Sequence, residues 1–183
     1  MTKQEIKNKL IDNHKIFTDY IISLSEADFL FSFQNKWTAG QQIGHVCRTT
    51  SPLLLALAIP KMFAKLLFGK LKRSLKGYDS LVQEYLLKLQ NGAKASVIYI
   101  PKKIDFHERS KFSGKLLKTV AKIDKLIDKF SEKELDQIIL PHPILGKLTI
   151  REMLYFTIYH VQHHHNLAKK NLSQKNINSK LVT

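Results

Sequence analysis

The feature that most constrains the fold is a repeat of apolar residues at intervals of three and four, which runs through most of the chain. This spacing places the apolar side chains on one face of an α-helix, whereas a half-buried strand would show strict alternation. Near the N-terminus it predicts a helix over about residues 2–24, with an apolar face made of Ile6, Leu10, Phe17, Ile21 and Leu24.

Capping motifs mark where two further helices begin. Thr38 is followed three residues later by Gln41, and Thr149 by Glu152, so each hydroxyl residue can start a capping box. The first box predicts a helix that Pro52 kinks or ends. The second predicts a helix from Thr149 to about residue 170. Apolar periodicity predicts another long helix over about residues 107–130.

These helices indicate an all-α fold, a four-helix bundle, because packing helix on helix buries such apolar faces. One or two extra helices are expected between the second and third main helices. They are a basic amphipathic stretch from Lys61 to Lys76 and a helix over about residues 78–90. Residues 97–101 are expected to be a short extended segment or a loop, and residues 141–146 a loop. The 183 residues suit one domain, 1–172, followed by a polar tail, 173–183.

The formal net charge of +15 raises the question of nucleic-acid binding. Only four of the 30 basic residues are arginine, the residue best suited to bidentate hydrogen bonding with phosphate or guanine. The lysines are spread from Lys3 to Lys180. We therefore interpret the charge as a solvated lysine-rich surface and expect no specific nucleic-acid partner.

The single cysteine, Cys47, excludes an internal disulfide and favours a reducing compartment. We expect it to be a small buried apolar side chain rather than a nucleophile. The N-terminal sequence lacks the apolar run of a signal peptide, and no stretch reaches the roughly 18 apolar residues of a membrane span. A cytoplasmic protein without a transmembrane segment is therefore expected.

A histidine cluster carries the strongest chemical signal in the sequence. Four of the eight histidines fall within residues 160–165. His160 and His164 are one helical turn apart, so they share a face and can converge on one metal ion. Both lie toward the apolar face of the helix, whereas His163 falls outside that face and His165 on its other flank. The pair His160 and His164 is thus predicted to bind the ion without its neighbours.

Zinc and similar ions need at least a third protein ligand, and His45 is the candidate. It lies mid-helix beside apolar residues, with Gln41 one turn before it and Thr49 one turn after it. A polar strip inside a bundle needs partners or a ligand. Gln41 is accordingly a candidate to orient a water or to support a metal ligand. No residue stands out as a general base, and the catalytic residues stay unassigned.

Two segments resemble motifs of the DinB/YfiT-like superfamily. Trp37-Thr38-Ala39-Gly40-Gln41-Gln42-Ile43-Gly44-His45 resembles its W-[ST]-xx-Q-xxx-H element, and His160-Val161-Gln162-His163-His164 resembles its closing H-xx-HH helix. The resemblance spans roughly residues 1–170. It implies a four-helix bundle with one metal ion bound by three histidines, which correspond to His45, His160 and His164. Many members carry a glutamine at the position of Leu167, so any role of that glutamine is in doubt here.

The resemblance also sets the expected chemistry. Some relatives resemble thiol-dependent transferases and isomerases that use a low-molecular-weight thiol, and others are treated as metal-dependent hydrolases. We therefore expect a metalloenzyme of the hydrolase or thiol transferase kind, a homodimer that acts on a small molecule. Zinc or nickel is the expected metal, with iron, manganese or copper as further candidates.

Two other interpretations remain open at this level. The chain can be a binding module that keeps the metal site without catalysing a reaction. It can also bind a membrane surface or a nucleic acid through the basic amphipathic stretch 61–76. That stretch can equally pack on the bundle, cover the site or form a dimer contact.

Overall fold

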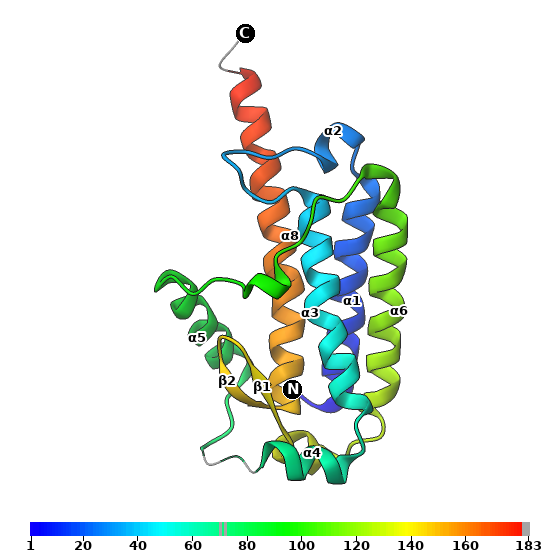
Figure 1. Ribbon diagram of the computed structural model, residues 1–183, viewed down its shortest axis with the longest axis vertical. Coiled ribbons are helices and arrows are strands. Elements are labelled where there is room, and N and C mark those ends of the chain that lie inside the picture. Colours follow the sequence, from blue (N-terminus) through cyan, green and yellow to red (C-terminus); the bar gives the residue numbers. More distant parts are fainter. Residues whose placement is uncertain (70, 72, 181–183) are drawn as a thin grey trace.

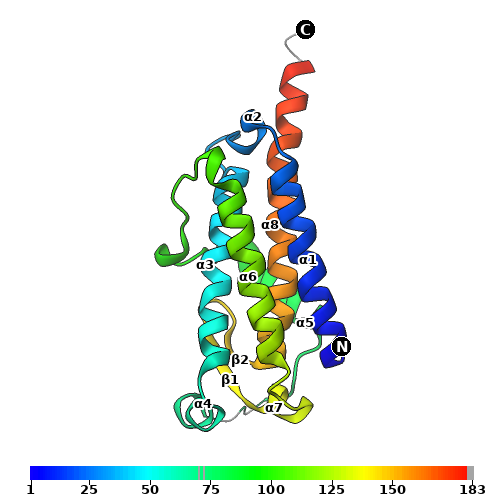
Figure 2. The same ribbon diagram turned by 90° about the vertical axis from the view of Figure 1, so that its right-hand side faces the viewer.

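Four long helices form the body of the protein in a computed structural model that describes residues 1–69, 71 and 73–180, with the backbone alone for 65–68 and 176–180. They are α1 (Lys3–Ser23), α3 (Ala39–Ala58), α6 (Arg109–Ile127) and α8 (Ile150–Lys180). Figure 1 shows the four helices running side by side. Helices α1 and α3 each pack against both α6 and α8, so α1 and α3 lie diagonally across the bundle, with α6 and α8 between them in Figure 2. Figure 2 shows the same helices from the side. The predicted all-α bundle is confirmed.

The capping boxes predicted from the sequence form in the structure. The Thr38 hydroxyl accepts a hydrogen bond from the Gln41 backbone N–H, and the Gln41 side chain accepts one from the Thr38 N–H. Thr149 and Glu152 make the same reciprocal pair at the start of α8. These side chains satisfy N–H groups that have no partner within the first helical turn.

Helix α3 continues through Pro52 to Ala58 instead of ending there. Proline removes one donor from the helical ladder and leaves carbonyls of the preceding turn underused. The hydroxyls of Thr49, Thr50 and Ser51 donate to carbonyls of residues 45–47. These bonds supplement the helical ladder in the turn before Pro52, and α3 continues to Ala58.

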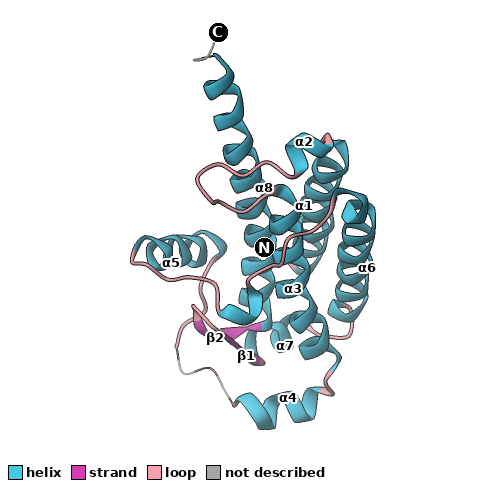
Figure 3. Cartoon of the chain, turned by 45° about the horizontal axis from the view of Figure 1, so that its top comes forward, coloured by secondary structure: helices cyan, strands magenta, loops and turns pink. Residues whose placement is uncertain are grey.

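The smaller helices lie at both ends of the bundle and along its side (Figures 1 and 2). They are α2 (Glu26–Phe29), α4 (Lys61–Phe68), α5 (Tyr78–Gln90) and α7 (Glu132–Gln137). Helix α5 packs on the outer side of α8, and α4 contacts the strand β1 (Ile139–His142; Figure 3). The helix expected over 61–76 ends at Phe68, so the basic stretch is not one continuous helix. Lys70 and Lys72 lie outside the described residues.

A β-hairpin precedes α8, where the sequence predicted only a loop over residues 141–146. Strand β1 (Ile139–His142) pairs antiparallel with β2 (Gly146–Thr149). Each strand has only four residues, which is too short for a clear alternation of apolar and polar side chains. Tertiary packing determines this element, because Leu140 and Leu148 face each other and are both buried.

The long connection between α5 and α6 crosses over α3. It contains two short 3-10 turns, η1 (Val97–Tyr99) and η2 (Phe106–Glu108), so residues 97–101 are not extended. Gly44 permits the crossing, since a Cβ atom there would lie 2.6 Å from Cδ1 of Ile104. The missing side chain lets the connection lie directly on α3 beside His45.

Helix α8 is longer than predicted and reaches Lys180 rather than residue 170. The part of the expected tail at 181–183 lies outside the described residues. Asn171, which is buried, explains why the helix stays attached to the bundle beyond residue 170. Its side chain accepts from Phe33 N at 2.9 Å and donates to the carbonyls of Phe31 and Trp37. Within the described chain, no helix combines the length and apolar character needed to cross a membrane.

Candidate metal centre

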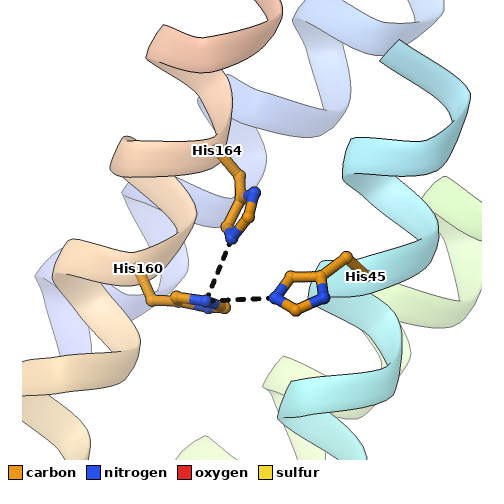
Figure 4. Close-up of side chains that lie close together, drawn as sticks. All are labelled: His45, His160 and His164. Atoms are coloured by element: carbon orange, nitrogen blue, oxygen red, sulfur yellow. Dashed lines mark hydrogen bonds between the residues drawn. The ribbon is translucent and has the colours of Figure 1, made fainter. Parts of the chain in front are cut away.

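Three buried histidines from two helices converge at the middle of the bundle. His45 comes from α3, and His160 and His164 come from successive turns of α8; their rings point toward one another (Figure 4). His45 Nε2 lies 3.4 Å from His160 Nε2, and His164 Nε2 lies 3.0 Å from the same atom. The three residues predicted from the sequence are thus brought together.

These separations suit a metal ion. Zinc–nitrogen bonds of ~2.0–2.1 Å in tetrahedral geometry place two ligand nitrogens ~3.3 Å apart. The two observed Nε2 distances, 3.0 and 3.4 Å, lie close to that value. The three histidines can therefore hold one ion and leave part of its coordination sphere open.

Hydrogen bonds fix the orientation of two of the three rings. Nδ1 of His45 lies 2.8 Å from the carbonyl oxygen of Tyr99 in the crossing connection. Nδ1 of His164 lies 2.5 Å from Oε1 of Gln42. Because both oxygens can only accept, each Nδ1 carries the proton and each Nε2 presents its lone pair inward. This is the usual way in which outer partners hold metal-binding histidines.

The support that we expected from Gln41 comes instead from Gln42. The Gln41 amide is used in the helix cap, where its Oε1 accepts from Thr38 N at 3.1 Å. Both glutamines flank the face of His45, so helical phase does not separate them. The capping box itself was the available signal, because it already assigned the Gln41 side chain to another partner.

The protonation states of the three histidines favour metal binding. Burial lowers the pKa of His160 and His164 well below the usual value, and the neighbouring imidazoles lower it further. Burial also lowers the pKa of His45, against the opposing effect of its bond to the Tyr99 carbonyl. Neutral imidazoles are the form that binds metals. If His160 Nε2 carries a proton, it can donate that proton to Nε2 of His45 or of His164, but not to both. A cation can bind the lone pairs of both nitrogens.

The adjacent histidines have other surroundings, as helical phase predicts. His165 packs on α1, with its ring 4.7 Å from that of Tyr20 and 5.8 Å from that of Phe17. His163 is half-buried and lies at the edge of the site, 5.9 Å between ring centroids from Tyr85. Among the described residues, neither belongs to the group of three whose nitrogens converge.

The open side of the histidine group faces a cavity of about 440 Å³. Trp37 forms part of its wall, and its ring lies 5.0 Å from that of His45 and 6.3 Å from that of His164. Apolar and aromatic side chains make up most of the lining, a composition typical of a pocket for a small molecule. The polar side chains of the lining outside the histidine group are Thr49, Tyr85, Ser96, Tyr99, His142, Thr157 and His163.

Glu152 and Cys47 carry ionisable side chains but do not line the cavity. Glu152 is buried, binds Arg73 with both carboxylate oxygens and caps α8, so it stays directed away from the cavity. Cys47 is 4% exposed, and burial raises the pKa of its thiol to about 12. The expectation of a buried apolar cysteine is confirmed.

The comparison with protein families agrees with this geometry. The model of the DinB superfamily matches residues 9–168, which includes all three histidines. This chain belongs to the DinB superfamily. Comparisons with curated proteins and with solved structures gave no match. In this DinB protein, Leu167, the position at which the resemblance led us to expect a glutamine, is 36% exposed.

Proposed function

We propose that this DinB protein binds one divalent transition metal ion through His45, His160 and His164 and uses it to act on a small molecule. The convergence of three buried, neutral imidazole nitrogens carries the proposal. Zinc or nickel is the metal we propose first, because imidazole suits both; iron, manganese and copper are further candidates.

An ion held by three neutral imidazoles keeps its full charge and open positions, which would let it acidify a water or bind a thiolate. The chemistry proposed is therefore that of a hydrolase or a thiol transferase, with a low-molecular-weight thiol as the co-substrate in the second case. The cavity beside the histidines supports a substrate that is small and largely apolar. The cavity lining offers imidazole, phenol and hydroxyl groups to orient it.

Metal analysis of tag-free protein tests this proposal. We expect about one equivalent of metal per chain, lost in His45→Ala and His160→Ala. The matched controls are His163→Ala and His165→Ala, which change neighbouring imidazoles outside the converging group. Retention of metal by His45→Ala, or equal loss in the controls, would overturn the assignment.

Activity separates the enzyme from a binding module. We expect conjugation of a thiol to an electrophile, or hydrolysis of an activated amide, to require metal and to disappear in His160→Ala. A protein that binds metal stoichiometrically, yet turns over neither substrate class, is better described as a binding module. The homodimer and the cytoplasmic location stay predictions.

Binding of a phosphate-rich surface through residues 61–76 has weaker support. Lys61 pairs with Glu134 at 2.7 Å, and Arg73 pairs with the buried Glu152. These two cations are already matched by carboxylates of the same chain, so they do not support the function; the side chains of Lys65, Lys70 and Lys72 lie outside the described residues.

A further inference from the structure

A fourth histidine, His142, shares the cavity with the three that converge, but it lies on a different element. It is the last residue of β1, and its ring lies 4.3 Å from that of Phe156. The Phe156 ring in turn lies 4.8 Å from that of His160. One aromatic ring thus separates His142 from the histidine group, and both border the same cavity.

The hairpin fixes which nitrogen of His142 carries the proton. Nδ1 lies 3.2 Å from Ile144 N and 3.0 Å from Leu145 N, and both backbone groups can only donate. Nδ1 must therefore accept, so the neutral ring carries its hydrogen on Nε2. Burial lowers the pKa of His142 to about 4, so the ring stays neutral at physiological pH. Within the described residues, Nε2 makes no hydrogen bond.

We infer that His142 Nε2–H is a fixed hydrogen-bond donor that binds an oxygen acceptor of the substrate, at the opposite side of Phe156 from the metal site. The inference rests on the proposed function and names the substrate class more closely. The substrate carries a group that binds metal, an apolar middle that packs on Phe156 and a carbonyl or similar oxygen beyond it. The described residues that line the cavity include no Asp, Glu, Lys or Arg, so a neutral acceptor is the matching group.

Two substitutions separate the two nitrogens of His142. In His142→Asn, the amide oxygen can replace Nδ1 as acceptor for the turn, but nothing replaces the Nε2–H donor. In His142→Gln, the longer side chain can present an N–H near the position of Nε2 but gives up the short-range acceptor. His142→Asn is expected to keep the hairpin and lose the hydrogen-bond donor in the cavity. His142→Gln is expected to keep that donor, destabilise the hairpin and unfold at a lower temperature.

The probes are straight-chain keto acids of increasing length, with the ketone beside the terminal methyl, each compared with the saturated acid of equal length. Calorimetric titration is carried out on zinc-loaded and on metal-free protein. We expect one chain length at which the wild type binds the keto acid roughly two- to tenfold more tightly than its saturated partner. This preference should disappear in His142→Asn and persist in His142→Gln.

The inference is overturned if no keto acid is preferred in either form of the protein, or if the preference survives in His142→Asn. It is also overturned if long-range proton–nitrogen NMR of metal-free protein finds the His142 proton on Nδ1. Failure to bind zinc would instead contradict the proposed function, because the paired comparison and the NMR experiment do not need the metal.

Discussion

The side-chain oxygen of Gln42 lies 2.5 Å from Nδ1 of His164, so one helix orients a metal-binding ring on another. Both residues are buried, with Gln42 4% and His164 5% exposed. Bulk water therefore does not readily replace this hydrogen bond. Through this hydrogen bond, the geometry of the candidate metal centre depends on the packing of α3 against α8. Substitution of Gln42 tests this dependence.

Replacing Gln42 should weaken metal binding while leaving the fold intact. Gln42→Leu removes the acceptor that fixes the His164 ring, and loss of such a partner lowers metal affinity by about 10- to 100-fold. Competition with a chromogenic chelator measures the change. Gln41→Leu is the matched control, since it should cost helix stability through the cap but leave the affinity unchanged. Equal affinity in the wild type and Gln42→Leu would contradict this role.

Two glycine substitutions should change stability in opposite directions. Gly44→Ala places a Cβ 2.6 Å from Ile104 Cδ1, and overpacking of this kind costs about 1–3 kcal/mol. Gly114→Ala in α6 meets nothing within 4 Å, so helix propensity should stabilise it by up to ~1 kcal/mol. Urea unfolding measures both. Adding Ile104→Val should recover part of the loss in Gly44→Ala; no recovery would argue against this contact.

The folded protein should lose stability as the pH decreases, because His14 is buried. Burial lowers the pKa of His14 to about 4, whereas in the unfolded chain the ring takes up its proton near the ordinary histidine pKa of 6.5. The unfolded state therefore binds more protons between these values, and stability is lost as the pH decreases from about 6.5 to 4. His14→Leu should remove up to about 3 kcal/mol of this dependence. Unfolding of metal-free protein across this range, with the exposed His107→Gln as control, measures it.

The single tryptophan should report on the metal site. Because the Trp37 ring lies 5.0 Å from that of His45, metal binding should change its fluorescence. Asn171→Ala frees the loop that carries Trp37 and leaves partly buried backbone groups without their side-chain partner, at a cost of about 1 kcal/mol. We expect a smaller fluorescence response in Asn171→Ala than in the exposed control Asn166→Ala. Equal responses would show that Asn171 does not position the ring.

Cys47 should resist modification in the folded protein, since the thiolate is the reactive form and burial raises the thiol pKa to about 12. Reaction with a disulfide reagent is expected only after unfolding, and Cys47→Ala should bind metal as the wild type does. Rapid reaction of the native protein, or a loss of metal in Cys47→Ala, would contradict this expectation.

Local signals predicted the parts of the structure that local interactions determine. The caps at Thr38 and Thr149 located the starts of two helices, and the spacing of His160 and His164 placed both imidazoles on the inward face. His45 was predicted to be the third ligand because its helix face is polar and because it matches the family motif. Each of these expectations depended on residues within one or two helical turns of one another.

The remaining features depend on contacts between distant segments. The hairpin of β1 and β2 is too short for a periodic signal, and His142 gains its fixed tautomer only from the turn that the hairpin forms. The Tyr99 carbonyl reaches His45 because the connection crosses α3 at Gly44. The extension of α8 past residue 170 likewise depends on Asn171 and the loop near the other end of the chain.

The crossing of residues 95–104 over α3 links metal binding at His45 to ligand binding in the cavity. Ala95, Ser96 and Tyr99 border the cavity, and the Tyr99 carbonyl also holds the His45 ring. A ligand that displaces this segment on entry would therefore change metal affinity, and the metal would change ligand affinity by the same factor. Metal retention and ligand occupancy are then thermodynamically coupled through one backbone carbonyl.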